Sequence, residues 1–264
     1  MKKIFDFYCN HHFHLSLCLI FFTMFQYRYL GLDIDWRYIY YVFFSTMLIY
    51  NLHKVKREDY NLFLNIRKVI ILFCIGSLIV LTIGQSLEKT IYLLPAAVIS
   101  FLYVLPLLPG KKKLNQFGWL KIMVLVVTLT YVTTFLPLYF SETNINVLFL
   151  VSISRFFFIF TLALLFDIRD LEKDFSLGIK TLPSGMGVKN TFILAGFLLM
   201  MSFSLDFYMV YEFITLMPVF LSMAFTFIFF CLFIFLSPRI FSNESFSFWA
   251  DNLLALPFCF LYFV

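Results

Sequence analysis

The chain has 264 residues, of which 62% are hydrophobic and 13% are charged, and its mean hydropathy is +0.93. Soluble domains carry about 25% charged residues, so this composition excludes a water-soluble globular protein. It indicates instead a single all-α domain, residues 1–264, that crosses a membrane several times. The net charge of +5 does not indicate a nucleic-acid partner, because the basic residues fall between the apolar segments.

Nine apolar segments follow one another along the chain. Most reach the roughly 17 to 25 residues that a helix needs to cross a bilayer. They lie approximately at residues 15–25, 38–52, 69–84, 91–108, 119–140, 146–166, 191–210, 214–236 and 247–264. We therefore expect about nine transmembrane helices around a central cavity. Three prolines, Pro106, Pro137 and Pro218, lie within or at the ends of segments and predict kinks.

The basic residues predict the orientation. With nine crossings, the amino terminus and the loops after every second segment share one side of the membrane. That side carries 16 of the 20 Lys and Arg residues, counting Lys121 at its edge, against 3 on the other side, and Arg155 lies within a segment. Because positive loops stay inside, we expect a cytoplasmic amino terminus and an extracytoplasmic carboxyl terminus in a bacterial inner membrane.

Histidines and cysteines do not form a recognisable metal motif. His11, His12 and His14 precede the first segment without an evident fourth ligand, so we expect them to act as interfacial aromatic-like residues. The five cysteines are scattered, mostly in apolar segments, and form neither a disulfide framework nor a C-x-x-C site.

A dense cluster of carboxylates follows the sixth segment. Asp167, Asp170 and Asp174 are spaced i, i+3, i+7, which places them on one face of a helix within roughly 60°. Three such groups repel one another unless a cation lies among them, and hard oxygen ligands suit Mg²⁺. The alternative is a solvated acidic helix end whose partners are Lys173 and Lys180.

The stretch from Asp167 to Pro183 resembles the second aspartate-rich motif of the UbiA superfamily of membrane prenyltransferases. The three aspartates, then Gly178, then Thr181-Leu182-Pro183 stand at the spacings of that motif. The resemblance implies that Asp167, Asp170 and Asp174 hold Mg²⁺, which bridges the diphosphate of an isoprenyl substrate. It also implies an electron-rich acceptor, which is an aromatic ring in most relatives.

The first motif of that superfamily, Asn-Asp-x-x-Asp-x-x-x-Asp, is degenerate here. Asn51 and Asp59 fit the pattern, whereas Leu52 and Val55 replace two of its aspartates. The resemblance therefore implies a diphosphate contact from Asn51 and a metal ligand at Asp59, but not a full second metal site.

Lys54 could also bind a phosphate group from this loop. Asn51, Lys54 and Glu58 are spaced i, i+3, i+7, so we expect them on one helix face. The lysine could neutralise phosphate oxygens as a point charge in place of one metal ion. The other interpretation is that the loop only follows the positive-inside rule. Both remain open.

The loop after the fourth segment adds aromatic and basic groups. Relatives in the UbiA superfamily carry a Tyr and a basic pair in this region, which implies that Tyr103, Lys112 and Lys113 help to hold the diphosphate. We add Lys180, within the acidic stretch, to that set. A lysine triplet in such a loop attracts anionic lipid equally well.

Arg155 is the basic residue that lies deep in an apolar segment. Charges inside a membrane are costly and usually face a partner. The sequence offers Asp206, Glu212 and Asp251 as partners. Arg155 forms either a structural ion pair or a contact with the acceptor substrate.

Two functions from different classes follow. The first is Mg²⁺-dependent transfer of an isoprenyl group from an isoprenyl diphosphate to a hydrophobic acceptor in the lipid membrane, with Asp167, Asp170, Asp174 and Lys54 as catalytic residues. The second is an inactive protein of the same fold that binds isoprenoid lipid or scaffolds a membrane complex. A CDP-alcohol phosphotransferase is excluded because Asp-Gly and Ala-Arg do not occur ahead of Asp170. The two halves of the chain show no similarity that would favour a transporter.

Overall fold

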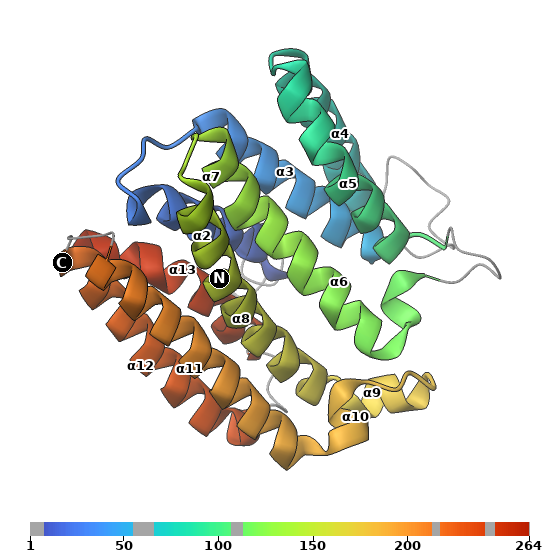
Figure 1. Ribbon diagram of the computed structural model, residues 1–264. Coiled ribbons are helices and arrows are strands. Elements are labelled where there is room, and N and C mark those ends of the chain that lie inside the picture. The colour runs from blue at the N-terminus through green and yellow to red at the C-terminus, as the bar shows by residue number, and fades with distance from the viewer. Residues whose placement is uncertain (1–7, 55–65, 107–112, 213–216, 241–245, 264) are drawn as a thin grey trace.

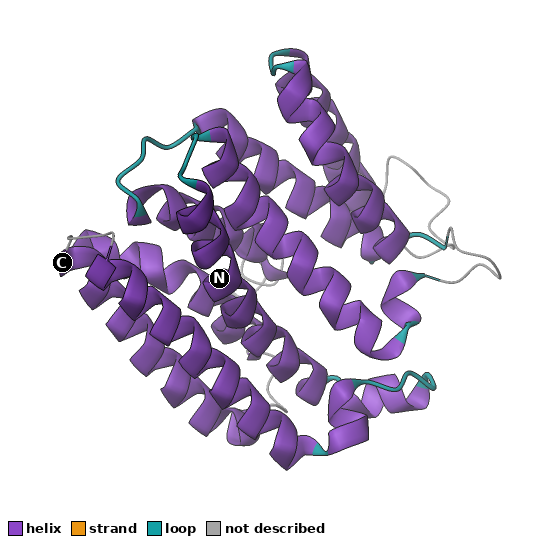
Figure 2. Cartoon of the chain, viewed as in Figure 1, coloured by secondary structure: helices purple, strands orange, loops and turns teal. Residues whose placement is uncertain are grey.

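A computed structural model describes residues 8–54, 66–106, 113–212, 217–240 and 246–263 (Figure 1). Helices make up nearly all of these ranges, and no strand occurs in them (Figure 2). The predicted all-α class is therefore confirmed. Asp59 and Lys112 lie outside the described residues.

Nine long rods correspond one by one to the nine apolar segments within the described ranges. They are α2 (Phe13–Tyr29), α3 (Trp36–His53), α4 (Ile66–Ile83), α5 (Leu87–Val104), α6 (Gly118–Thr130) continued by η3 (Tyr131–Phe135) and α7 (Leu136–Phe140), α8 (Ile145–Arg169), α11 (Val188–Glu212), α12 (Met217–Ile240) and α13 (Phe246–Phe263). Three short elements connect rods: η2 (Leu114–Gln116), α9 (Leu171–Ser176) and α10 (Leu182–Met186).

Six of the described rods are long and apolar enough to cross a membrane. They are α4, α5, α6 to α7, α8, α11 and α12. The helices α2 and α3 have 17 and 18 residues and include more polar side chains, and α13 carries a shorter apolar stretch. The chain is an integral membrane protein.

Short polar side chains start several of the rods. Asp35 accepts a hydrogen bond from the backbone N–H of Tyr38 at the start of α3, at 3.1 Å. Asn144 accepts one from the backbone N–H of Asn146 at the start of α8, at 3.0 Å. Such caps satisfy N–H groups that have no partner inside the first helical turn.

The rod from α6 to α7 changes its winding just before Pro137. Residues Tyr131–Phe135 form a π-helical turn there. Pro137 has no N–H to donate to the preceding turn, so the backbone must re-pair near it. The Tyr38 hydroxyl donates to the Val132 carbonyl at 2.6 Å and pairs one acceptor of this turn. The irregularity predicted at Pro137 is therefore confirmed.

Helix α8 lies at the centre of the bundle. It packs along α11 and against α6, while α2 packs on α13 and α13 on α12 (Figure 1). The hairpin of α4 and α5 stands at one side of the bundle and packs mainly on α3. In α4 only Ile71 and Cys74 are buried, because most of that helix faces away from the protein.

Arg155 is held in a buried network that joins three rods. Its Nη1 donates to both carboxylate oxygens of Asp206 at 2.8 Å, and its Nε donates to Gln26 Oε1 at 2.8 Å. The Tyr29 hydroxyl also donates to Asp206, at 3.2 Å, and the guanidinium lies 4.8 Å from the Tyr29 ring centroid. Of the partners that the sequence offered, Asp206 is the one observed, and the structural ion pair is confirmed.

Candidate functional site

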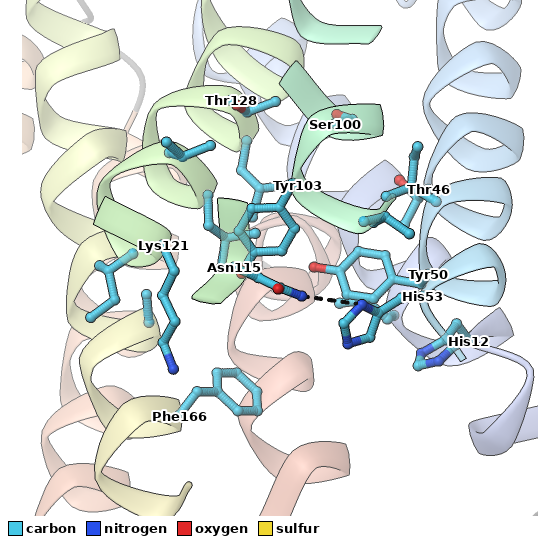
Figure 3. Close-up of a pocket in the computed structure, with 18 of the residues that line it drawn as sticks. His12, Thr46, Tyr50, His53, Ser100, Tyr103, Asn115, Lys121, Thr128 and Phe166 are labelled. Atoms are coloured by element: carbon cyan, nitrogen blue, oxygen red, sulfur yellow. Dashed lines mark hydrogen bonds between the residues drawn. The ribbon is translucent and has the colours of Figure 1, made fainter. Parts of the chain in front are cut away.

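A cavity of about 1700 Å³ opens at the end of the bundle where α8 meets α9. Its walls come from α3, α5, α6 and α8, with contributions from the starts of α2 and α13. Figure 3 shows Lys121 and Phe166 on one side of this space, Tyr103 and Asn115 near its middle, and Tyr50, His53 and His12 on the other side. The cavity thus has a mouth rich in polar groups.

Lys121 lies between two of the predicted carboxylates. Its Nζ is 3.0 Å from Asp167 Oδ1 and 2.5 Å from Asp174 Oδ2. Asp167 is 5% exposed and Asp174 is 6% exposed, so both are largely removed from water. The other oxygen of Asp167, Oδ2, is buried without a hydrogen-bond partner. Two buried carboxylates therefore converge on the ammonium of Lys121, and one carboxylate oxygen, Asp167 Oδ2, has no hydrogen-bond partner.

The three aspartates do not share one continuous helix face, and that prediction was wrong. Helix α8 ends at Arg169, Asp170 is the residue between α8 and α9, and Asp174 belongs to α9. Asp170 instead makes a two-pronged pair with its neighbour Arg169, both contacts at 2.9 Å. The break lets α9 fold back so that Asp174 still meets Asp167 through Lys121.

Two glycines shape the loop around this cluster. Gly178 adopts a φ of 71° just after the end of α9 and lets the chain turn there. Gly118, with a φ of 39°, begins α6 so close to the loop that an added Cβ would lie 2.3 Å from the carbonyl oxygen of Lys180. This close approach brings Lys121 against the acidic loop. Pro183 lies in the first turn of α10.

Basic side chains surround the mouth of the cavity. Lys54, Lys113, Arg169 and Lys173 all line it together with Lys121. The pKa of Lys54 is lowered, first by partial burial and then by the positive charges of Arg67 and Lys173. Among the described lining residues, these five basic side chains exceed the four aspartates by one, and the resulting positive charge favours an anionic ligand.

The other predicted site residues fall into two groups. Tyr103 and Lys113 line the cavity. Asn51 does not: it is fully buried, and its Nδ2 donates to the carbonyls of His11 at 2.9 Å and Met47 at 2.8 Å. Lys180 is exposed and lies outside the cavity lining. Helix α3 ends at His53, so the expected helical register of Asn51, Lys54 and Glu58 does not extend past Lys54 in the described residues.

The wall opposite Lys121 carries groups that the sequence did not single out as a site. His12, Tyr50 and His53 line the cavity there, and Asp251 also belongs to the lining. His12 has a left-handed backbone with φ 60°, and its ring lies 5.3 Å from that of Tyr50. Burial, and then the charge of Lys54, lowers the pKa of His12 to about 3, so its imidazole is neutral. The expected aromatic-like role of the histidines is seen in His14, which stacks on Phe248 at 4.2 Å.

Lys121 is the central residue that sequence reasoning missed. It was counted only as part of the positive side of the membrane. A signal did exist, because a lysine one turn inside an apolar segment needs a partner. Nothing in the spacing of α6, however, indicates that its partners lie on α8 and α9.

The donor set can be compared with what Mg²⁺ requires. Mg²⁺ in proteins is commonly held by one or two carboxylates together with phosphate oxygens and waters. Asp167 and Asp174 fit this requirement, because they converge and because Asp167 Oδ2 is an unused acceptor. Among the described residues, no three His, Cys, Asp or Glu side chains converge on one position. A metal ligand role for Asp170, which faces Arg169, stays a prediction.

Comparison with known proteins gives one informative match. No protein-family model matches the chain, and no curated protein matches it. A solved structure of digeranylgeranylglyceryl phosphate synthase in membranes, a UbiA-family prenyltransferase, matches with a TM-score of 0.58. The match covers 99% of this chain and 98% of that one, at 16% sequence identity. The two proteins share a fold.

At this identity the likeness concerns the fold alone. It extends over the whole length of both chains, so the rods around the cavity have counterparts throughout. Function has to be argued from the side chains that line the cavity.

Proposed function

We propose that this protein is a membrane prenyltransferase, which moves an isoprenyl group from an isoprenyl diphosphate to a hydrophobic acceptor with the help of Mg²⁺. One observation carries the proposal. Two buried carboxylates, Asp167 and Asp174, converge at the lysine-rich mouth of a large cavity whose interior is apolar. A diphosphate with an isoprenyl tail has the matching distribution of charge and hydrocarbon.

The basic residues of the rim would hold the diphosphate. Lys54, Lys113 and Lys173 line the mouth and can each donate to phosphate oxygens. Asp167 and Asp174 would hold Mg²⁺, which supplies Lewis-acid stabilisation of the charge on the leaving diphosphate. Lys121, already placed between the carboxylates, keeps them together in the absence of ligand.

The reaction requires the allylic C–O bond to break and a new bond to form to the same carbon. The diphosphate leaves with the bonding electrons, the acceptor supplies an electron pair, and the acceptor loses a proton. The lysines stabilise the negative charge as it develops on the diphosphate. Tyr103 and Phe166, which line the cavity near the carboxylates, present ring faces that can stabilise an allylic cation.

The mouth of the cavity would face the cytoplasm of a bacterial cell. The supporting observation is the excess of Lys and Arg in the loops on that side. A reporter fused after Val264 is expected outside, and one inserted near Lys112 inside. Both reporters on one side of the membrane would contradict nine crossings.

A second candidate is a lipid-binding protein without catalysis. It is favoured by Leu52 and Val55 in the place of motif aspartates, and by Lys121, whose ammonium already fills the point where a metal would lie. In that case the cavity would retain an isoprenoid lipid without cleaving a diphosphate.

The experiment that separates them uses purified protein in lipid nanodiscs. A panel of isoprenyl diphosphates is supplied with Mg²⁺ and a membrane extract as the source of acceptor, and released diphosphate and prenylated products are measured. The transferase predicts Mg²⁺-dependent release that Asp167→Asn abolishes. No release with any diphosphate, together with isoprenoid lipid that copurifies with the protein, would establish the second candidate.

A further inference from the structure

We infer that Lys121 is an internal counter-ion of the two carboxylates, and that a divalent metal displaces it effectively only when a diphosphate binds as well. The inference rests on the proposed function, because it takes Asp167 and Asp174 to be metal ligands. It goes further by giving Lys121 two alternating partners, the carboxylates and the diphosphate, and by predicting that metal and diphosphate bind cooperatively.

The lysine ammonium and a divalent metal require the same carboxylates. Lys121 Nζ lies 3.0 Å from Asp167 Oδ1 and 2.5 Å from Asp174 Oδ2. A Mg²⁺ ion bound to Asp174 Oδ2 at about 2.1 Å would therefore lie within about 4.6 Å of Nζ. Two positive charges at that separation repel each other. Lys121 must therefore leave before both carboxylates can bind the metal.

Burial determines what can replace each partner. The side chains of Lys121, Asp167 and Asp174 are 12%, 7% and 9% exposed, so water cannot stabilise these charges well. Removing one partner of a buried ion pair leaves an uncompensated charge, which is strongly unfavourable. The carboxylates therefore release Lys121 only to another cation, and Lys121 leaves them only for another anion.

The described lining of the cavity offers Lys121 no evident second anion. Its flexible side chain lines the cavity (Figure 3). The other two aspartates of that lining are Asp170 and Asp251, and Arg169 acts on both: it pairs with Asp170 at 2.9 Å, and its charge acts on Asp251. Three further lysines line the same cavity. A displaced Lys121 therefore needs a bound polyanion such as a diphosphate as its new partner.

These requirements couple the two ligands. A metal alone would leave the Lys121 ammonium without an anion, and a diphosphate alone would leave the ammonium on the carboxylates. When both bind, the metal neutralises Asp167 and Asp174, and the diphosphate accepts hydrogen bonds from Lys121. Each ligand therefore raises the affinity for the other by the same factor.

The test measures metal binding without catalysis. Equilibrium dialysis of Mn²⁺, which takes the same oxygen ligands as Mg²⁺, is performed on the protein in zwitterionic nanodiscs, with and without inorganic pyrophosphate. At equal free Mn²⁺, pyrophosphate is expected to raise the affinity of the wild-type protein on the order of tenfold. Lys121→Gln removes the competing cation, so it is expected to bind Mn²⁺ alone about tenfold more tightly than the wild type and to gain less from pyrophosphate.

Two further variants serve as controls. Lys173→Gln removes a positive charge next to Asp174, but Lys173 is exposed and forms no ion pair within the described residues. It is expected to change the Mn²⁺ affinity less than Lys121→Gln does. Asp167→Asn is expected to remove the bound Mn²⁺, which assigns it to this site. Thermal unfolding monitors the folding of Lys121→Gln, and Mn²⁺ alone should raise its melting temperature more than that of the wild type.

Equal affinity of the wild type and Lys121→Gln for Mn²⁺ alone, with binding that depends on Asp167, would overturn this inference and leave the proposed function intact. An equal gain in Lys173→Gln would also overturn it. If Lys121→Gln does not fold, equally tight binding of Mn²⁺ to the wild type with and without pyrophosphate would overturn it. If neither protein binds Mn²⁺ under either condition, both this inference and the proposed function fail.

Discussion

Helix α8 carries two buried charges, Arg155 and Asp167, and their surroundings differ. Arg155, 1% exposed, faces one carboxylate, Asp206, which is 2% exposed, and donates a further hydrogen bond to Gln26 on a neighbouring rod. Asp167 shares a single lysine with Asp174 and opens onto the cavity.

The first cluster balances its own charge, and the second does not. Neither Arg155 nor Asp206 lines the cavity, so a ligand there cannot reach them. In the second cluster two carboxylates face one ammonium, and three further lysines of the described lining, Lys54, Lys113 and Lys173, lie at the rim of the same cavity. A charged ligand that brings both a cation and a polyanion would satisfy both imbalances. We therefore interpret the Arg155 cluster as structural and the Asp167 cluster as functional.

The largest expected effect follows from disrupting the Arg155 cluster. Arg155→Met leaves Asp206 as an uncompensated buried charge and is expected to lower the free energy of unfolding by about 3 to 5 kcal/mol. The double variant Arg155→Met/Asp206→Leu should recover most of this loss, because it removes both charges. Denaturant-induced unfolding of the detergent-solubilised protein measures the free energy of unfolding of both variants. Equal stability of the single variant and the wild type would contradict a structural role for Arg155.

Substitutions in the Asp167 cluster should affect ligand binding more than they affect the stability of the protein. Asp167→Asn is expected to weaken Mg²⁺-dependent binding of an isoprenyl thiolodiphosphate at least tenfold, because it removes a negatively charged oxygen ligand of the metal. Asp170→Asn should have a smaller effect, since Asp170 is paired with Arg169. Calorimetric titration of both variants compares them directly. A larger effect of Asp170→Asn would mean that α9 rearranges when the ligand binds.

A further prediction concerns a single lysine at the rim of the cavity. Lys54→Ala removes one charge-assisted contact to the diphosphate and is expected to slow turnover on the order of tenfold to a hundredfold. Lys180→Ala is the matched control, because Lys180 is an exposed lysine near the same mouth that does not line the cavity. Initial rates with a saturating acceptor provide the measurement. Equal losses in both variants would indicate a general electrostatic effect rather than a contact from Lys54.

The fold could be predicted from the sequence because apolar length is a local property. Each apolar segment became a rod, and Pro137 marked an irregular turn. Partners of buried charges were predicted only in part. Asp206 was one of three candidates for Arg155, because burial demands a carboxylate but does not say which rod supplies it.

The site was predicted in its chemistry but not in its geometry. Asp167 and Asp174 were expected together on one helix, yet they meet because the chain breaks at Asp170 and folds back. Lys121 and His12 enter the site from rods far away in the sequence, so no local spacing could reveal them. Asn51 matched a motif and still faces the backbone of the amino-terminal segment instead of the cavity.

The central claim is that the cluster at Asp167 and Asp174 is a place for a metal and a diphosphate. The most direct test is calorimetric titration of farnesyl thiolodiphosphate into the wild-type protein in nanodiscs, with Mg²⁺ and with a chelator. The account predicts saturable binding at one site with Mg²⁺ and binding at least tenfold weaker with the chelator. Equal binding under the two conditions, or no binding under either, would contradict it.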